Sequence, residues 1–305
     1  MTRSRLSVTA MIVMLGVVMS GCASRIQFPA VSGHSSTSLT LVGDLYRPDG
    51  SGRLPAVVLL APCAGVTQHM GSWATWLKGQ GYVALIVDSF SSRGSRNACR
   101  GESPRVPDAA RDALAALSYL TTLPFVDGER VAVIGWSNGA GAALAVSRLT
   151  RLDSEFAGRP TFRAAVAFYP PCQFLDDSTQ TPTLMLLAGR DDWTPTARCM
   201  ATEGQRLLSW KLYPNAYHAF DQPGPMRTYL GHVLAYDGSA TDASQEEVWR
   251  FLAQELRGKR ESRLDHVDDS TVELPAATDR VLALLALRPL SAGVRRVVSA
   301  ATARE

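Results

Sequence analysis

Short apolar runs alternate with amphipathic segments along most of this chain, and this alternation leaves few folds open. Strands are predicted at 37–46, 56–60, 82–87, 131–134, 163–168, 183–187 and 210–213. Helices are predicted at 73–78, 108–120, 139–149, 197–208 and 246–256. The run AVVLL at 56–60 is apolar throughout, which is typical of a strand buried on both faces. Strictly alternating strands and helices predict an α/β fold with a mostly parallel central sheet and helices on both faces.

A single domain over residues 38–257 accounts for this pattern. The chain has 305 residues, of which 46% are hydrophobic, so it can bury a core without disulfides or a structural metal. Residues 258–305 follow as a C-terminal tail of balanced charge with one apolar stretch at 281–287. We expect this stretch either to dock on the domain as a short helix or to seek a surface.

The first 21 residues have the features of an export signal. Arg3 and Arg5 precede an apolar run at 6–18, and the letters MSGC follow at 19–22. A basic start, a short apolar core and small residues at the end define such signals, and the run is too short to span a membrane comfortably. The segment resembles a bacterial lipobox, which implies cleavage before Cys22 and lipidation of its thiol. An ordinary signal peptide or an uncleaved anchor is the alternative.

Lipidation at Cys22 implies that the domain is exported and anchored in the bacterial cell envelope, on a membrane surface facing the periplasm. Residues 22–37 are polar and predict a tether. An oxidising compartment permits disulfides. Four cysteines remain in the exported domain: Cys63, Cys99, Cys172 and Cys199. Four cysteines allow three pairings, among which their spacing does not choose.

Charge and side-chain clustering exclude several classes of partner. The chain has 31 Lys and Arg against 28 Asp and Glu, with a formal net charge of +3, and both signs are spread along its length. No basic face is expected, so no nucleic-acid partner is predicted. The sequence contains no metal-ligand spacing and no phosphate-binding glycine loop between a strand and a helix. We therefore predict neither a metal nor a cofactor.

Residues 135–139, GWSNG, stand directly between a predicted strand and a predicted helix. In this context G-x-S-x-G forms a sharp turn that exposes the serine at the top of the sheet. The two glycines leave room for neighbouring backbone, and the helix directs its N-terminal amides towards an oxyanion beside the serine. Ser137 is therefore the predicted nucleophile.

A nucleophilic serine needs a base, and with this motif the order along the chain is serine, acid, histidine. His218 follows the strand at 210–213 by a few residues, where its side chain can reach the top of the sheet. His218 is the predicted base. The remaining histidines do not combine the required order with a suitable position: His34, His69, His232 and His266.

The acid is expected at the end of the preceding strand, where Asp191 and Asp192 stand side by side. Adjacent side chains point in different directions, so one can orient the histidine while the other caps a helix or faces solvent. We predict Asp191 as the acid, with Asp192 as the alternative. Asp176 and Asp177 precede that strand instead of ending it.

An acyl-transfer site also needs hydrogen-bond donors for the oxyanion. The predicted donors are the backbone N–H groups of Asn138 and of Cys63, which lies on the loop after the first buried strand. The Cys63 thiol is a poor candidate nucleophile because its loop lacks the sharp strand-to-helix turn. Trp136, Trp193 and Tyr217 flank the predicted catalytic residues and are expected to form apolar walls of the substrate pocket.

Five strings carry a resemblance to a known family: APCAGV at 61–66, VDSF at 87–90, GWSNG at 135–139, AGRDDWTP at 188–195 and YPNAYHAFD at 213–221. In this order and spacing the chain resembles the dienelactone hydrolase branch of the α/β-hydrolases over roughly residues 40–257. The resemblance implies the α/β-hydrolase fold, with Ser137 as nucleophile, Asp191 as acid and His218 as base.

The chain departs from the family pattern at two points. The namesake enzymes have a cysteine nucleophile where this chain has Ser137, which favours general ester hydrolysis over hydrolysis of a dienelactone. Ala61 and Pro62 replace the His-Gly pair that is common in the wider superfamily.

The resemblance also bears on the cysteines. In such a sheet, the strands that end near Cys63 and Cys99 are neighbours, as are those that end near Cys172 and Cys199. This implies the disulfides Cys63–Cys99 and Cys172–Cys199, with free buried thiols as the alternative.

The predicted function is that of a cofactor-free serine hydrolase that cleaves a carboxylic ester or a lactone through an acyl-enzyme. The absence of a long insertion before the last helix favours a small acyl group. Two alternatives stay open: an acyltransferase that uses the same three residues, and a non-catalytic envelope binding protein on a hydrolase scaffold. The complete set of three residues argues against the second.

Overall fold

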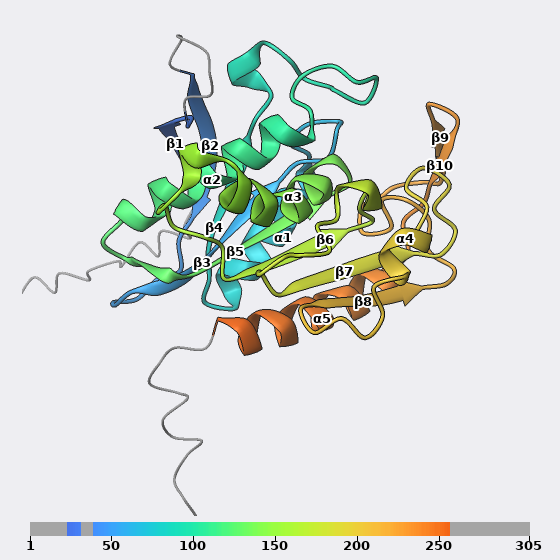
Figure 1. Ribbon diagram of the computed structural model, residues 1–305. Helices are drawn as coiled ribbons and strands as arrows, with labels where there is room; N and C mark the ends of the chain where they lie inside the picture. Colours follow the sequence, from blue (N-terminus) through green and yellow to red (C-terminus); the bar gives the residue numbers. More distant parts are fainter. Residues whose placement is uncertain (1–22, 32–38, 257–305) are drawn as a thin grey trace, which may run out of the picture. The chain divides into compact units, whose positions relative to one another are not determined.

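The computed structural model describes residues 23–31 and 39–256, and one sheet of eight strands organises them (Figure 1). In chain order these are β1 (Ser24–Pro29), β2 (Thr40–Tyr46), β3 (Leu54–Leu60), β4 (Val83–Asp88), β5 (Val126–Trp136), β6 (Ala164–Phe168), β7 (Thr183–Ala188) and β8 (Leu208–Tyr213). They lie in the order β1-β2-β4-β3-β5-β6-β7-β8. β2 is antiparallel to both of its neighbours, and all the other pairs are parallel. The predicted α/β fold is confirmed.

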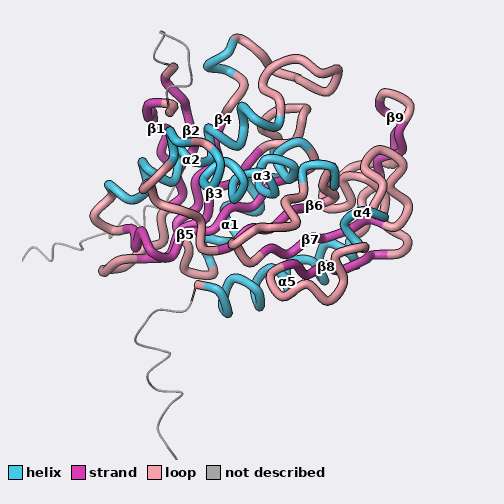
Figure 2. Tube along the Cα trace, in the orientation of Figure 1, coloured by secondary structure: helices cyan, strands magenta, loops and turns pink. Residues whose placement is uncertain are grey.

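Helices cover both faces of the sheet, as the cyan and magenta segments of Figure 2 show. They are α1 (Gln68–Gly79), α2 (Val106–Thr122), α3 (Asn138–Leu152), α4 (Ala197–Met200) and α5 (Gly238–Glu255). Trp73 of α1 and Leu252 of α5 pack in one core with Val57 of β3. Leu117 of α2 packs in the other core with Val58 of the same strand. Successive strand side chains point to opposite faces, so β3 supplies both cores.

The N-terminal edge of the sheet corrects the prediction that 22–37 form a tether. Residues 24–29 form β1, which pairs with β2 in antiparallel register. Phe28 is 2% exposed, and Ile26 packs partly buried against the same core. Two alternating apolar side chains therefore hold this strand. Such a short alternation is weak in the sequence because the other face of an edge strand is polar.

Two further features differ from the sequence-based expectation. The helix predicted at 197–208 ends at Met200, and turns that include Gly204 at φ +82° lead into β8. A two-stranded hairpin, β9 (Arg227–Tyr229) and β10 (His232–Leu234), precedes α5. Strands of this length are too short for apolar alternation to register in a sequence.

Several predictions concern residues outside the described ranges. These are the signal at 1–21, the lipidation of Cys22 and the C-terminal tail at 258–305 with its possible short helix. Within the described ranges, no helix combines the length and the hydrophobicity that crossing a membrane requires.

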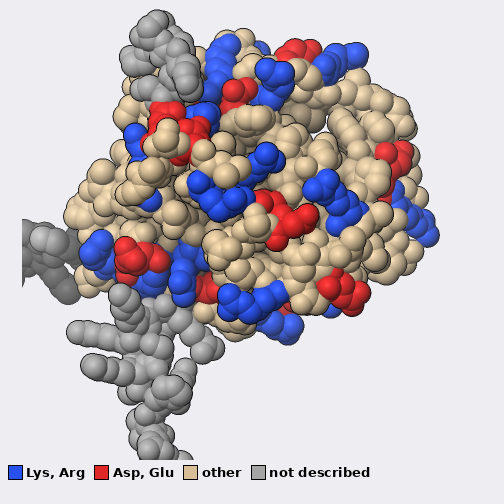
Figure 3. All heavy atoms as spheres, viewed as in Figure 1, with Lys and Arg blue, Asp and Glu red and all other residues tan. Residues whose placement is uncertain are grey.

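Basic and acidic side chains are intermixed on the face of the molecule drawn in Figure 3. Ion pairs contribute to this mixing across the described surface; Arg111, for example, pairs with both Asp153 and Glu155. No patch of a single sign covers the face shown.

The parallel strands bring their carboxyl ends to one edge of the sheet, where ligands bind in open α/β folds. Ser137 follows β5, Asp191 follows β7 and His218 follows β8. Because β7 lies between β6 and β8, and β5 lies next to β6, these three side chains can meet although they are far apart in the sequence.

Candidate active site

Ser137 lies in a turn between β5 and α3 that two glycines permit. Its backbone has φ +51° and ψ −112°. A positive φ is unusual for a residue with a Cβ atom, and such positions cluster at functional sites. A Cβ at Gly135 would lie 2.0 Å from the carbonyl oxygen of Gly139, and a Cβ at Gly139 would lie 2.3 Å from that of Leu60. Glycine at both positions allows β5, α3 and β3 to approach closely enough to fix the turn.

A continuous chain of hydrogen bonds joins three side chains at this edge. His218 Nε2 lies 3.0 Å from Ser137 Oγ, and His218 Nδ1 lies 2.8 Å from Asp191 Oδ2. Ser137 is 7% exposed and His218 is 3% exposed, and the side chain of Asp191 is fully buried. The structure therefore brings together the three residues that the sequence singled out.

Asp191 has partners besides His218. Its Oδ1 accepts the backbone N–H groups of Trp193 at 2.9 Å and Thr194 at 3.0 Å, and its Oδ2 accepts the hydroxyl of Thr194 at 2.7 Å. Burial alone would raise the pKa of Asp191, but the hydrogen bonds with His218 and Thr194 outweigh it and hold the pKa below its usual value. Asp191 is therefore an ionised acceptor that fixes the orientation of the imidazole.

The neighbouring Asp192 is in a different environment. Its side chain is 50% exposed and lies 3.5 Å from Nδ1 of His232. Asp176 pairs with Arg151 at 3.0 Å. The geometry thus favours Asp191 as the partner of the His218 imidazole.

His69, which the chain order excluded, lies in the core beside Trp136, with ring centroids 5.3 Å apart. Burial lowers the pKa of His69, which favours a neutral ring.

Two disulfides join loops at the same edge of the sheet. Cys63, after β3, is bonded to Cys99, after β4, and Cys172, after β6, is bonded to Cys199 in α4, after β7. These are the two pairs that the resemblance implies. Each connects the loops of two adjacent parallel strands.

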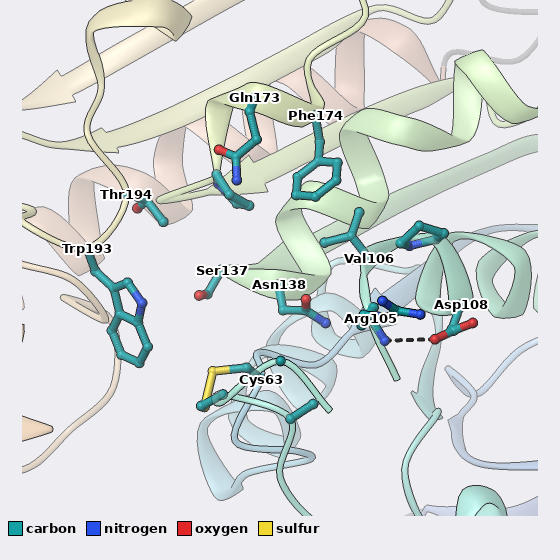
Figure 4. Close-up of a pocket in the computed structure, with 15 residues that line it drawn as sticks. Cys63, Arg105, Val106, Asp108, Ser137, Asn138, Gln173, Phe174, Trp193 and Thr194 are labelled. Atoms are coloured by element: carbon teal, nitrogen blue, oxygen red, sulfur yellow. Dashed lines mark hydrogen bonds between the residues drawn. A yellow bond between two sulfur atoms is a disulfide. The ribbon is translucent and has the colours of Figure 1, made fainter. Parts of the chain in front are cut away.

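Two clefts meet at Ser137. The larger has a volume of about 520 Å³, and its walls include Arg105, Val106, Asn138, Gln173 and Phe174 (Figure 4). The smaller has a volume of about 200 Å³, and its walls include Tyr169, His218, Arg227, Tyr229 and Leu234. Ser137, Trp193 and the Cys63–Cys99 disulfide border both clefts.

The three aromatic residues expected in the pocket have different positions. Trp193 borders both clefts, with its ring centroid 5.0 Å from that of His218. The prediction is wrong for Trp136, which is 0% exposed: it is the last residue of β5 and lies on the same strand face as Ile134, in the core. Tyr217 lines neither cleft; its hydroxyl accepts a hydrogen bond from Arg190 at 3.3 Å.

Asp221 is a buried carboxylate that the sequence reasoning did not single out. It is 2% exposed. Its Oδ2 accepts the indole N–H groups of Trp73 at 2.8 Å and Trp136 at 2.7 Å, and its Oδ1 accepts the hydroxyl of Tyr169 at 2.7 Å. Burial and the charge of Asp221 raise the pKa of Tyr169 well above its usual value, so the phenol remains a donor.

These hydrogen bonds place Asp221 between the elements that carry the site. Trp136 directly precedes Ser137, and the Tyr169 ring lies 4.7 Å from the ring of His218. Asp221 therefore connects the strand end that bears Ser137 to the loop that bears His218. The available sequence signal was the string HAFD, in which an acid follows two apolar residues, three positions after the expected base.

The predicted oxyanion donors belong to the cleft walls. Cys63 and Asn138 both border the larger cleft beside Ser137. Asn138 is the first residue of α3, where backbone N–H groups lack intrahelical partners and the helix dipole is positive. The Asn138 side-chain nitrogen is buried without a hydrogen-bond partner among the described residues. The start of α3, rather than this buried side chain, favours an anion beside Ser137.

This geometry would allow His218 to exchange a proton with Ser137 Oγ, and it would allow Asp191 to stabilise a charged imidazole. Across residues 23–31 and 39–256, His, Cys, Asp and Glu side chains form no group of three or more that could hold a metal.

The sheet, its helices and the strand-to-helix turn at Ser137 define an α/β-hydrolase fold. A model of the dienelactone hydrolase family matches residues 41–256. The chain belongs to this family, and it is therefore a member of a hydrolase family.

Comparisons with individual proteins agree with this assignment. A Bradyrhizobium protein named "Probable 2-oxo-3-(5-oxofuran-2-ylidene)propanoate lactonase" is 26% identical over 242 residues, which are 71% of this chain and 90% of the relative. The "Polyketide transferase ATR5" of Stachybotrys chlorohalonatus is 26% identical over 182 residues, 57% of each chain.

Among solved structures, the dienelactone hydrolase-like promiscuous phosphotriesterase P91 from metagenomic libraries superposes with a TM-score of 0.59 at 22% identity, over 78% of this chain and all of that one. At this identity the likeness concerns the fold.

Proposed function

We propose that this protein is a serine hydrolase that cleaves a carboxylic ester or a lactone through an acyl-enzyme. The observation that carries the proposal is the unbroken chain of hydrogen bonds from Ser137 through His218 to Asp191, at 3.0 Å and 2.8 Å. It ends at a strained turn bordered by two clefts. A nucleophile, a base and an orienting acid in this order are the elements of acyl transfer.

In the acylation step, Ser137 Oγ attacks the carbonyl carbon of the substrate while His218 Nε2 takes the hydroxyl proton. The carbonyl π pair moves to oxygen and forms a tetrahedral oxyanion. The pair then returns, the bond from carbon to the leaving-group oxygen breaks, and His218 donates the proton to that oxygen. Asp191 accepts the Nδ1–H of His218 throughout and stabilises the imidazolium.

In the deacylation step, water takes the place of the leaving group. His218 removes a proton from water as the water oxygen attacks the acyl carbon, and then returns it to Ser137 Oγ as the ester bond breaks. The backbone N–H groups of Cys63 and Asn138 stabilise the oxyanion in both steps, where removal of one such donor typically lowers kcat about 10²–10³-fold.

Membership of a hydrolase family supports this reaction class. The serine nucleophile favours ester hydrolysis within it. The matched relative from Bradyrhizobium is named as a lactonase. In this chain the nucleophile is a hydroxyl, which His218 must activate because its own proton is bound far more tightly than that of a thiol. We therefore place general ester hydrolysis ahead of the thiolate chemistry of the family's namesakes.

The test mixes the purified domain with 4-nitrophenyl butanoate in excess and follows nitrophenolate release and intact mass. We expect turnover, and a butanoyl adduct on the peptide that contains Ser137 in acid-quenched samples. Ser137→Ala should show neither. Turnover that persists undiminished in Ser137→Ala contradicts the proposal.

A second candidate function is acyl transfer to an acceptor other than water. The similarity to a polyketide transferase over 57% of the chain favours keeping it. The same three residues form the same acyl-enzyme, and only the attacking oxygen or nitrogen differs. Addition of alcohols or amines to the ester assay distinguishes the two, because a transferase converts most of the acyl group to the new ester or amide at low acceptor concentration.

We also propose that the protein is exported and held on the periplasmic side of a bacterial membrane by a lipid on Cys22. The basic start, the apolar run and the cysteine at 22 support this, as do two disulfides, which persist in oxidising compartments. Radioactive palmitate should label the wild-type protein in cells and should not label Cys22→Ala. Labelling of Cys22→Ala, or an unlabelled wild type, contradicts the anchor.

A further inference from the structure

We propose that the two clefts divide the substrate: the larger holds the acyl group and the smaller holds the alcohol. The preferred substrates are then open-chain esters of a bulky acid with a compact alcohol. This inference rests on the proposed function and deepens it, because it assigns each side of the scissile bond to named walls.

The position of His218 sets the direction. His218 lines the smaller cleft and does not line the larger one. The imidazole must hand its proton to the leaving-group oxygen, which requires that oxygen to come within hydrogen-bond reach of Nε2, about 2.6–3.2 Å. The alcohol part of the substrate therefore extends into the smaller cleft.

The start of α3 gives the complementary argument. Asn138 borders the larger cleft and is absent from the walls of the smaller one. An oxyanion held by the Asn138 amide, with the leaving group at His218, leaves the remaining substituent of the carbonyl carbon directed into the larger cleft. That substituent is the acyl chain.

The sizes and walls of the clefts define the substrate class. About 520 Å³ on the acyl side accommodates a sizeable group, whereas about 200 Å³ on the alcohol side admits a compact one. Val106 and Phe174 give the acyl side apolar surface, and Arg105 and Gln173 lie beside them (Figure 4). This size reverses the expectation of a small acyl group, which rested on the lack of a long insertion.

The shared wall favours an extended substrate over a small ring. Trp193 and the Cys63–Cys99 disulfide border both clefts, so the two volumes join across Ser137. An open-chain ester places its two parts on opposite sides of the serine. In a small lactone the two parts are one ring, which cannot occupy both clefts.

Two isomeric esters test the division. Methyl 5-phenylpentanoate has a bulky acid and a compact alcohol, and 4-phenylbutyl acetate reverses them with the same atoms. Both are alkyl esters of similar intrinsic reactivity. We expect kcat/KM for the methyl ester to exceed that for the acetate by about tenfold or more, the size of discrimination that differences in pocket filling typically produce.

Matched substitutions assign the clefts. Arg105 and Arg227 are both exposed, and each borders a different cleft. Arg105→Trp partly fills the larger cleft and should lower kcat/KM for methyl 5-phenylpentanoate about tenfold more than it lowers kcat/KM for 4-nitrophenyl acetate. Arg227→Trp partly fills the smaller cleft and should lower kcat/KM for 4-phenylbutyl acetate severalfold more than it lowers kcat/KM for methyl 5-phenylpentanoate.

The outcomes separate this inference from the proposed function. Equal rates for the two isomers, a preference for the acetate, or the opposite response of the two variants overturns the division of the clefts while the hydrolase stands. Hydrolysis of 4-nitrophenyl acetate at Ser137 without hydrolysis of either isomer also overturns it. Failure of the proposed function itself appears as wild-type-like hydrolysis of 4-nitrophenyl acetate by Ser137→Ala, or as its absence in folded wild-type protein.

Discussion

The two disulfides of this domain are alike in topology and differ in surroundings. Each joins the loops that follow two adjacent parallel strands, at the same edge of the sheet. Cys63 and Cys99 are half-buried and border both clefts at Ser137. Cys172 and Cys199 are 3% and 0% exposed and pack in an apolar cluster with α3 and β7.

The difference shows that a disulfide in the same topological position can either fix a loop at the active site or stabilise the core. The disulfides span 36 and 27 residues of sequence, so loop closure predicts a similar stabilisation of roughly 3–4 kcal/mol for each. Position distinguishes them. The first fixes the loop that offers the Cys63 amide, and Ala98 N–H donates to the Cys63 carbonyl at 2.7 Å. The Cys172–Cys199 disulfide instead stabilises the apolar cluster that it forms with α3 and β7.

The loop after β7 carries Asp191 and leads to Cys199. Its role at the site, through Asp191, must therefore be separated from its structural role, through the disulfide. Asp191→Asn keeps the shape but removes the charged acceptor for His218. We expect kcat/KM for a 4-nitrophenyl ester to fall about 10⁴-fold, the loss that follows when the histidine takes the wrong tautomer. Asp192→Asn is the matched control and should stay within about twofold. A comparable loss in Asp192→Asn contradicts the assignment of the acid.

Removing each disulfide tests the comparison itself. The double variant Cys63→Ala/Cys99→Ala should lower kcat about 10–10²-fold, because the oxyanion amide loses its fixed position. The double variant Cys172→Ala/Cys199→Ala should keep kcat within about twofold, although it leaves a cavity in the core and loses more stability. Steady-state kinetics and thermal melting measure the two effects. Equal losses of kcat in both variants break the comparison.

Asp221 provides a non-covalent link to set beside the two covalent ones. Asp221→Ala should lower kcat about tenfold, since it frees the strand end and the loop that carry Ser137 and His218. Asp221→Asn should stay within about threefold, because one amide oxygen can accept both indoles and the amide nitrogen can donate to Tyr169. Kinetics and melting of both variants are compared; an Asn variant as impaired as Ala would sink the positioning role.

The smallest expected effect is one of pH, which neither disulfide can produce. The folded pKa of Asp191 lies below its unfolded value, so the unfolded chain binds more protons. The stabilisation is complete above the ordinary aspartate pKa, about 4, and is lost as pH falls through the folded value. The melting temperature of the wild type should therefore fall more steeply below pH about 4 than that of Asp191→Asn. Parallel pH profiles contradict this.

The sequence identified what depends on local pattern and on chain order. Strands buried on both faces, such as 56–60, are apolar throughout and are easily recognised in a sequence. GWSNG stands between a strand and a helix that the apolar pattern also predicts. Ser137 and His218 followed from these placements, and the structure puts them 3.0 Å apart.

What escaped the sequence depends on contacts between distant segments. β1 has one buried side chain, Phe28, and one partly buried side chain, Ile26, and it acquires its structure from pairing with β2. Asp221 is defined by donors 148, 85 and 52 residues away, which no local pattern reveals. Trp136 was placed in the pocket because it adjoins Ser137, yet it ends β5 on the face that packs into the core, whereas Ser137 lies in the turn that follows.

The central claim is that His218 and Asp191 activate Ser137 as a nucleophile. Its most direct test is labelling of the purified wild-type domain with a fluorophosphonate, with peptide mass spectrometry and with Ser137→Ala and His218→Ala as controls. The account predicts one adduct, on Ser137, that disappears in Ser137→Ala and forms at least about 10³-fold more slowly in His218→Ala. A folded wild-type protein that stays unlabelled, or a label on another residue, contradicts it.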